Sequence, residues 1–166
     1  MGYVFGVCVE KNSELEPSTR KYKGRVVVQG NRVVNQSYEA AIFQDLGSAL
    51  ATLDASRAVD AYGCVPGHAI EVADAEQAYV QADMRGTPTW VCLPPEVRTG
   101  KARNMRRPVC RLKKALDGHP DAGAYWEEHC GAHVQSVGFE PTGCEWPSTY
   151  FHPGLQLYLV IYVDDF

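Results

Sequence analysis

The stretch that decides the fold runs from residue 157 to residue 166 and reads LYLVIYVDDF. Its first seven residues are apolar and predict a β-strand, and Asp164 and Asp165 then place two adjacent carboxylates at the end of that strand. Charges beside a buried strand cost free energy unless cations or hydrogen bonds compensate them, and carboxylate oxygens suit a hard cation such as Mg²⁺. An isolated pair of aspartates is more often a solvated turn, so the pair alone does not indicate a metal site.

A further acid, Asp74, ends residues 69–74, whose alternating side chains predict another short strand. If this strand lies beside the one at residues 155–163, Asp74 and Asp164 meet at one edge of the sheet. Three carboxylates there would repel one another unless metal ions filled the site. Two ions about 3.5–4 Å apart, binding the attacking and leaving oxygens, are what two-metal phosphoryl transfer requires. The sequence therefore supports the hypothesis of a phosphoryl-transfer site.

Two helices are predicted outside the final strand. One begins near Asp121, a candidate N-cap, and ends at Gly138. Its apolar face is formed by Trp126, Cys130, Val134 and Val137. The other helix lies between Asp45, also a candidate N-cap, and Gly63.

Further strands are predicted at residues 24–29, 32–35, 90–93, 109–112 and 149–151. Gly30 and Asn31 would form the turn between the first two, whereas residues 1–19 resemble a short apolar opening followed by a polar loop. Helices and strands are mixed without a repeating β-α-β order, which predicts the α+β fold class.

The distribution of charge matters more than its total. The chain has 166 residues, the size of one domain or of a piece of a larger one, and a net charge of −4. The segments 20–32 and 98–114 contain no acid and hold 13 of the 16 Lys and Arg residues. The rest holds three cations against 20 acids, a net charge of −17. Such basic segments are either solvated loops or surfaces that neutralise nucleic-acid phosphates.

The cysteines and the N-terminus predict an intracellular protein. Six cysteines are scattered without a CxxC spacing, and the first residues contain no basic leader or small-residue cleavage site. We therefore expect a cytoplasmic or nuclear location, reduced thiols and no secretion. No membrane association is expected, because the longest apolar run has only seven residues. His129, Cys130 and His133 lie within about one helical turn, but a zinc site would need more ligands.

Five segments, in order, resemble the reverse transcriptase of copia-type LTR retrotransposons over about residues 21–166. They are KYKGRVVVQG at residues 21–30, ADAEQAY at 73–79, TWVCLPP at 89–95, VCRLKKAL at 109–116 and YVDD at 162–165. The first is similar to the family's K-Y-K-A-R-L-V-A-K-G, the second to L-D-V-K-N-A-F, and the last is the family's Y-V-D-D. Each segment alone is only moderately specific, but five in order are a strong indication.

The resemblance implies a fingers and palm portion with an antiparallel palm sheet at residues 21–166, after a lead-in at residues 1–20. The implied activity is RNA-directed DNA polymerase, which transfers dNTPs onto a primer 3′-OH in an element whose DNA undergoes integration. Its implied partners are an RNA or DNA template–primer and dNTPs, and its cofactors are two Mg²⁺ ions, with Mn²⁺ as the alternative. The sequence does not indicate an oligomeric state.

The resemblance also assigns roles to individual residues. Asp74 and Asp164 would be the main metal ligands and catalytic residues, with Asp165 supporting them. Lys23 and Arg25 would contact the incoming triphosphate, where arginine presents a planar fork to phosphate oxygens. The nucleotide would also meet the backbone N–H groups of Gln77 and Ala78, and the Tyr79 ring that excludes a 2′-hydroxyl. The template–primer backbone would contact Arg103, Arg106, Arg107, Arg111, Lys113 and Lys114.

Several positions depart from the family pattern. Asp117 replaces an aromatic residue, Asp121 replaces a glutamine expected near the nucleotide, and Gln29 replaces a second lysine. The sequence also stops at Phe166, directly after the Y-V-D-D segment, without the strand, thumb and ribonuclease H region expected to follow. The alternative hypothesis is therefore a catalytically inactive, retroelement-derived fragment with at most non-specific nucleic-acid binding. On either hypothesis we expect residues 1–166 alone to show no primer extension.

Overall fold

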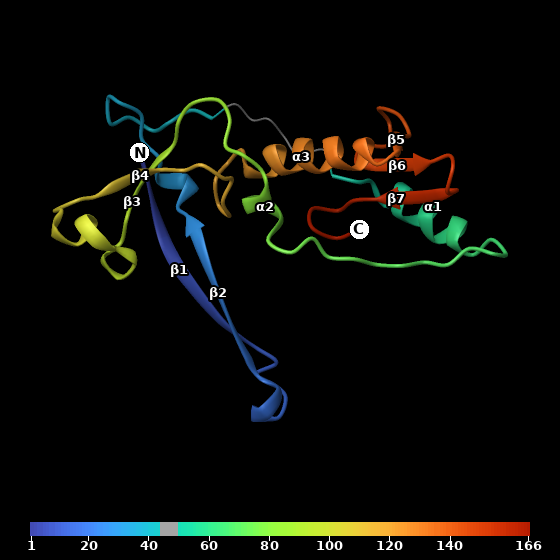
Figure 1. Cartoon of the computed structure of the whole chain (residues 1–166), viewed down its shortest axis with the longest axis horizontal. Coiled ribbons are helices and arrows are strands. Elements are labelled where there is room, and N and C mark those ends of the chain that lie inside the picture. The colour runs from blue at the N-terminus through green and yellow to red at the C-terminus, as the bar shows by residue number, and fades with distance from the viewer. Residues whose placement is uncertain (44–49) are drawn as a thin grey trace. The chain divides into compact units, whose positions relative to one another are not determined.

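A computed structural model describes residues 1–43 and 50–166 (Figure 1). The chain divides into two compact units. The first unit comprises residues 1–44 and 84–122, and the second comprises residues 45–83 and 123–166. Helices and antiparallel strand pairs occur together, as the α+β class predicts. None of the helices in the described part of the chain has the length and apolar character needed to cross a membrane.

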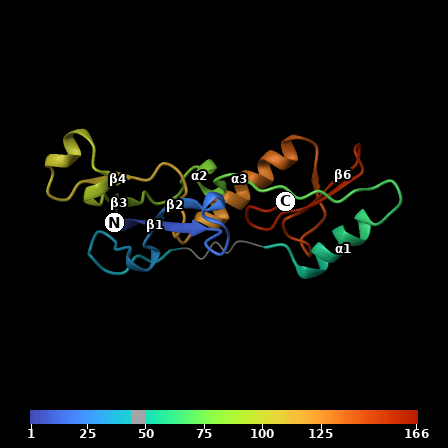
Figure 2. The same ribbon diagram turned by 90° about the horizontal axis from the view of Figure 1, so that it is seen from below.

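The first unit is built on a four-stranded sheet with the order β2-β1-β3-β4. Its strands are β1 (Gly2–Lys11), β2 (Lys21–Val28), β3 (Trp90–Cys92) and β4 (Val109–Arg111). β1 and β2 form a long antiparallel hairpin in which Val4 pairs with Val28 and Lys11 with Lys21 (Figures 1 and 2). β3 lies parallel to β1 and antiparallel to β4.

The predicted pairing of the hairpin was wrong. Residues 32–35 do not return as a strand, because β2 pairs with β1, in the segment that we expected to be an apolar opening and a loop. Gly30–Arg32 instead forms a short 3-10 helix, η2, and Val34 makes only an isolated bridge to Ala40. The β1–β2 ladder joins eight residue pairs, so it satisfies many more backbone groups than a four-residue return could.

The first unit has a small core. Val4, Val28 and Val91 are buried together, with Cys110, Leu112 and Leu116 partly buried around them. Gly118 packs tightly beside this core with φ +79, and a Cβ there would lie 2.2 Å from the carbonyl oxygen of Val28. Three further 3-10 helices lie in the unit's loops: η1 (Pro17–Thr19), η3 (Pro95–Val97) and η4 (Gly100–Asn104).

The second unit combines three helices with a three-stranded antiparallel sheet of order β5-β6-β7. The helices are α1 (Leu53–Gly63), α2 (Ala78–Gln81) and α3 (Ala122–Ser136), of which only Ala122 belongs to the first unit. The strands are β5 (Glu140–Pro141), β6 (Thr149–His152) and β7 (Leu157–Val160). The expected turn after His152 joins β6 to β7.

α1 starts later than the sequence predicted. Thr52 is its N-cap, and the Thr52 hydroxyl accepts a hydrogen bond of 3.1 Å from the backbone N–H of Ala55. Asp45, the predicted cap, lies outside the described residues. The predicted end at Gly63 agrees with the structure.

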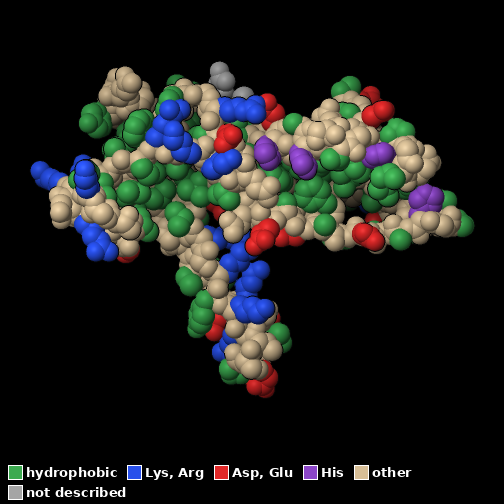
Figure 3. All heavy atoms as spheres, in the orientation of Figure 1, with side chains coloured by type: hydrophobic (Ala, Val, Ile, Leu, Met, Phe, Trp, Pro, Cys, Tyr) green, Lys and Arg blue, Asp and Glu red, His purple; other side chains and the backbone are tan. Residues whose placement is uncertain are grey.

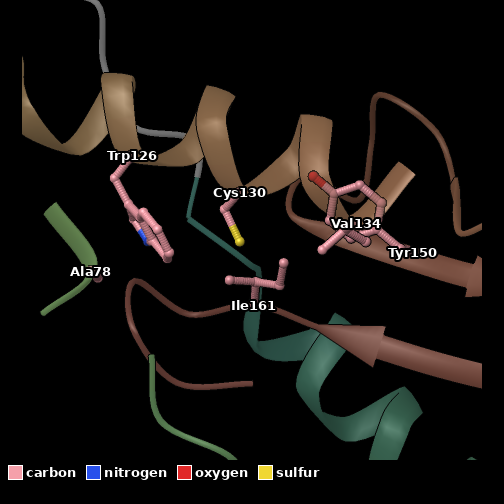
Figure 4. Packing of buried hydrophobic residues seen from close by; sticks show 6 residues of the cluster. All are labelled: Ala78, Trp126, Cys130, Val134, Tyr150 and Ile161. Carbon is pink, nitrogen blue, oxygen red and sulfur yellow. The ribbon is translucent and has the colours of Figure 1, made fainter. Parts of the chain in front are cut away.

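The core of the second unit forms between α3 and the β6–β7 hairpin (Figure 4). It is a cluster of six buried residues: Ala78, Trp126, Cys130, Val134, Tyr150 and Ile161. Three of the four side chains predicted for the apolar face of α3 are therefore buried. Val137 was wrongly assigned to that face, because α3 ends at Ser136 and the Val137 side chain is 55% exposed.

The strand predicted at residues 69–74 is absent. That segment has no strand pairing apart from an isolated bridge between Asp74 and Asp165. β7 also ends at Val160 rather than at Val163, since Tyr162 already begins a turn. β7 ends early because the chain folds back on itself at residues 162–165.

Candidate metal centre and nucleic-acid surfaces

A tight turn presents the two adjacent aspartates. The backbone N–H of Tyr162 donates to the carbonyl oxygen of Asp165 at 2.8 Å, and the N–H of Asp165 donates to the carbonyl of Tyr162 at 3.0 Å. Val163 sits inside this turn with φ 60, in the left-handed region that β-branched residues rarely adopt. The turn thus begins two residues after β7 ends and places Asp164 and Asp165 beyond the strand.

The segment around Asp74 is hydrogen-bonded to this turn. Ala73 and Phe166 exchange two backbone hydrogen bonds of 3.1 and 2.8 Å, and the N–H of Ala75 donates to the carbonyl of Asp164 at 2.6 Å. This register sets Asp74 opposite Asp165. The structure therefore brings Asp74 and Asp164 together, as expected, but through a short bridge rather than through two neighbouring strands.

The three carboxylates form one group. One oxygen each from Asp74, Asp164 and Asp165 lies within 4.8 Å of the others, and the group is open to solvent. Among residues 1–43 and 50–166, no Lys or Arg forms an ion pair with any of the three. Like charges so close repel one another, and a cation would remove that repulsion.

The donor set fits a divalent cation of the Mg²⁺ class. Such ions take carboxylate oxygens as ligands, and Mg²⁺ in particular keeps several water molecules when it binds to proteins. The group formed by Asp74, Asp164 and Asp165 offers hard oxygen ligands with access to water. It contains no cysteine or histidine, the ligands that predominate in structural zinc sites.

Three of the five residues expected to contact the nucleotide, Gln77, Ala78 and Tyr79, follow Asp74 after two intervening residues. Gln77 has φ 54 and precedes α2, whose first residue, Ala78, is buried. Tyr79 is half-buried and packs against the core cluster. The left-handed conformation at Gln77 makes the turn that leads from Asp74 into α2, so all four residues belong to one local structure of the second unit.

A pocket lies beneath this local structure. It is small, with a volume of about 40 Å³, and is lined by Tyr79, Trp126, Tyr150, Ile161 and Val163, among others. The indole N–H of Trp126 donates a hydrogen bond to the carbonyl oxygen of Val163. The sequence predicted Trp126 only as a core residue. No sequence pattern pointed to its bond with the turn, because that bond depends on how α3 is placed.

Lys23 and Arg25 lie on β2 in the first unit, where their side chains are exposed. They share one face of the hairpin with Lys21, opposite Val7, Val9 and Lys11 on β1. Figure 3 shows Lys and Arg side chains along this hairpin. The alternation of the strand therefore gathers positive charge on one face, as triphosphate or phosphate binding would require.

The second basic segment contains residues of two kinds. Some guanidinium groups make hydrogen bonds within the first unit: Arg107 donates to the distant Tyr3 hydroxyl at 2.8 Å, and Arg98 and Arg103 donate to the nearby backbone carbonyls of Leu93 and Arg98. The other expected phosphate-contacting residues are Arg106, Arg111, Lys113 and Lys114, and all four side chains are exposed. Sequence reasoning treated the whole segment as one surface and did not separate these two roles.

A buried histidine accompanies the positions that depart from the family pattern. His119 is 5% exposed, its Nδ1 accepts from the backbone N–H of Asp121 at 3.2 Å, and its Nε2 lies 3.1 Å from the Thr89 hydroxyl. Because Nδ1 is an acceptor, the neutral ring carries its proton on Nε2 and donates to Thr89. Burial lowers the pKa of His119, and the nearby charge of Asp121 opposes that shift.

The backbone of Asp117 also has a structural role, because its carbonyl accepts a hydrogen bond of 2.7 Å from the N–H of Val28. Asp117 and Asp121 both lie in the first unit, whereas the three clustered carboxylates lie in the second. The two departures from the family pattern are thus part of the packing around Val28 and His119.

Comparison with known proteins gives one match. The family model described as "Reverse transcriptase (RNA-dependent DNA polymerase)" matches residues 5–166, nearly the whole chain. Searches of curated proteins and of solved structures returned no significant match. Domains of this family generally use divalent metal ions, in agreement with the carboxylate group described above. The chain belongs to the reverse transcriptase (RNA-dependent DNA polymerase) family.

Proposed function

We propose that this chain is the fingers and palm portion of a copia-type reverse transcriptase, and that its carboxylates serve the two-metal transfer of dNTPs onto a primer 3′-OH. The observation that carries the proposal is the group of Asp74, Asp164 and Asp165, whose oxygens lie within 4.8 Å of one another. The family match over residues 5–166 supports the same reaction class.

In this proposal Asp74 and Asp164 are the main metal ligands, and Asp165 supports the site. Two Mg²⁺ ions, or Mn²⁺ in their place, would supply the positive charge that activates the 3′-OH and stabilises the departing pyrophosphate. The carboxylates hold that charge at a fixed place, and the bridge between Asp74 and Asp165 sets their separation before substrate arrives.

Five residues are proposed to bind the dNTP. Lys23 and Arg25 would pair with the triphosphate, and the backbone N–H groups of Gln77 and Ala78 would donate to its oxygens. Tyr79 would lie beneath the sugar and exclude a 2′-hydroxyl, which would select deoxynucleotides. The position of Tyr79, five residues after Asp74 and against the core, supports this role because a rigid ring discriminates better than a mobile one.

The template–primer would contact the second basic segment through its phosphates. The six proposed side chains are all exposed: Arg103, Arg106, Arg107, Arg111, Lys113 and Lys114. Arg107 also donates a hydrogen bond to the Tyr3 hydroxyl. Such contacts release counterions, so binding should weaken steeply with salt and depend little on sequence.

Primer extension on an RNA template with Mg²⁺ tests the reaction. The protein to use is a chimera in which the remaining palm, thumb and connection of a characterised reverse transcriptase follow Phe166. We expect it to incorporate dNTPs, the Asp164→Asn variant to lose at least 10³-fold, and the matched Asp60→Asn variant in α1 to keep full activity. Incorporation that survives Asp164→Asn would overturn the catalytic assignment.

Asp117 and Asp121 favour a second candidate, a catalytically inactive fragment that binds nucleic acid without specificity. A carboxylate close to a triphosphate would repel it. The same chimera separates the two candidates, because an inactive fragment would bind template–primer without extending it. Asp121→Gln, which restores the family's residue, would then be expected to recover incorporation.

A further inference from the structure

Trp126 lies behind the turn that carries Asp164 and Asp165. It belongs to α3, is 5% exposed, and points from that helix towards the turn in the core of the second unit (Figure 4). Its indole N–H donates to the carbonyl oxygen of Val163, which is 37 residues further along the chain. One buried side chain therefore ties the helix directly to the turn.

The carbonyl oxygen of Val163, which Trp126 binds, helps to set the orientation of Asp164. The carbonyl of Val163 and the N–H of Asp164 belong to one planar peptide group, so fixing that oxygen fixes the plane from which the Asp164 side chain departs. The two hydrogen bonds that close the turn join Tyr162 and Asp165 and do not involve this peptide. Trp126 thus restrains a part of the turn that the turn's own hydrogen bonds leave unrestrained.

The conformation at Val163 makes this restraint necessary. A β-branched residue with φ 60 is strained, and such strain persists only where the surrounding structure holds it. Without the indole hydrogen bond, the peptide between Val163 and Asp164 could rotate towards a more relaxed conformation. The Asp164 carboxylate would then move away from Asp74 and Asp165.

Trp126 also belongs to the cluster that supports the Asp74 side. Ala78 is buried in the same cluster, and Ala75 packs against it. Asp74 immediately precedes Ala75, so both acid-bearing segments of the site rest on one core. The indole ring therefore packs in the same core as the segment that follows Asp74.

We propose that Trp126 is a positioning residue for divalent-cation binding, acting through its hydrogen bond to the carbonyl of Val163. This inference rests on the proposed function, since it takes Asp74, Asp164 and Asp165 as the metal ligands. It assigns no contact between Trp126 and the ion. According to this proposal, the affinity of the three carboxylates for a cation depends on one indole N–H group.

The test is a Mn²⁺ titration of the 166-residue chain, in which free Mn²⁺ is counted by electron paramagnetic resonance. Trp126→Phe keeps an aromatic ring but removes the N–H. We expect its Kd for Mn²⁺ to rise about fivefold, the net effect of one hydrogen bond. The matched control is Val134→Ala, about two turns along α3 in the same core, which should lower Tm and leave the Kd unchanged.

Two results would overturn the positioning role. One is an unchanged Kd in Trp126→Phe when Asp164→Asn abolishes binding. The other is an equal weakening in Val134→Ala, because a general loss of core stability would then explain the effect. If instead the proposed function is wrong, Mn²⁺ binding by the wild-type chain will be absent or will be unaffected by Asp164→Asn.

A second measurement needs no change at Trp126. The indole ¹⁵N–H signals of Trp90, Trp126 and Trp146 are assigned with Trp90→Phe and Trp146→Phe, and Mg²⁺ is then added. We expect the Trp126 signal to shift as Mg²⁺ binds and the other two to stay. If the Trp126 signal does not move at saturating Mg²⁺, the indole is not coupled to the site and the inference is wrong.

Discussion

The two units of this protein handle charge in opposite ways. The first spreads Lys and Arg along an exposed hairpin and loops over a core of three buried valines. The second gathers three carboxylates at one point above a core of six buried residues. Phosphate backbones tolerate variable contact geometry, whereas a metal site requires oxygens at fixed separations. The larger core therefore lies where geometry has to be exact.

The largest effect is expected from Trp126→Ala. Removing the indole leaves a cavity in the core of the second unit, which should cost about 3–5 kcal/mol of its unfolding free energy. Val28→Ala in the first unit removes less volume and should cost about 2 kcal/mol. Hydrogen exchange of peptides from α3 and from β2 measures the two losses separately. Loss of protection in β2 on changing Trp126 would contradict the division into two units.

Metal binding should stabilise only the second unit. At Mg²⁺ ten times above its Kd, linkage predicts about 1.4 kcal/mol of added stability. The increase should be absent in Asp164→Asn, whose metal-free form should be slightly more stable than the wild type because one of three like charges is gone. Thermal unfolding with Mg²⁺ and with EDTA measures both the stabilisation by Mg²⁺ and the stability of the metal-free variant. A Mg²⁺ effect equal in the two proteins would show that the ion binds elsewhere.

Nucleic-acid binding should depend on the first unit. Removing one phosphate contact should reduce the slope of log Kd against log salt by about 0.7–0.9, depending on the nucleic acid. We expect this change from each of three substitutions: Arg103→Gln, Arg106→Gln and Arg111→Gln. Between 50 and 200 mM salt, one contact corresponds to about 0.7 kcal/mol. Arg57→Gln in α1 is the control and should leave the slope unchanged. Fluorescence anisotropy with a labelled RNA–DNA duplex gives the slopes.

The smallest effect concerns His119. Burial lowers its pKa in the folded chain, so the unfolded chain binds more protons as pH falls below about 6.5. The stability from neutral His119 is thus fully present above that pH and is lost as pH falls towards the folded pKa. Urea unfolding at pH 7.5 and 5.5 should show this loss. His119→Gln should reduce it, whereas the exposed His133→Gln should not.

The sequence predicted the parts of the site that depend on neighbouring residues. The end of an apolar run at Asp164 and the acid at Asp74 were both visible as local patterns, and the structure brings the two together. The helix of Trp126 and Cys130 was likewise predicted, because its apolar spacing is local and strong.

Pairing across long distances could not be predicted in the same way. β1 was missed because Gly2 and Gly6 interrupt its pattern and its partner lies beyond a loop of nine residues. The strand at residues 69–74 was wrongly predicted because alternation was visible but the absence of a long partner was not. The bond from Trp126 to Val163 depends on the final packing of α3, which no local pattern contains.

The bridge between Asp74 and Asp165 also has a consequence for folding time. Its two segments are about ninety residues apart in sequence, so it is among the contacts of highest sequence separation in the chain. Contacts of this kind form late, because closing a long loop costs entropy before it returns any stabilisation. During synthesis the three carboxylates cannot assemble until residues 162–166 have left the ribosome, so a cation bound there would report that the second unit has finished folding.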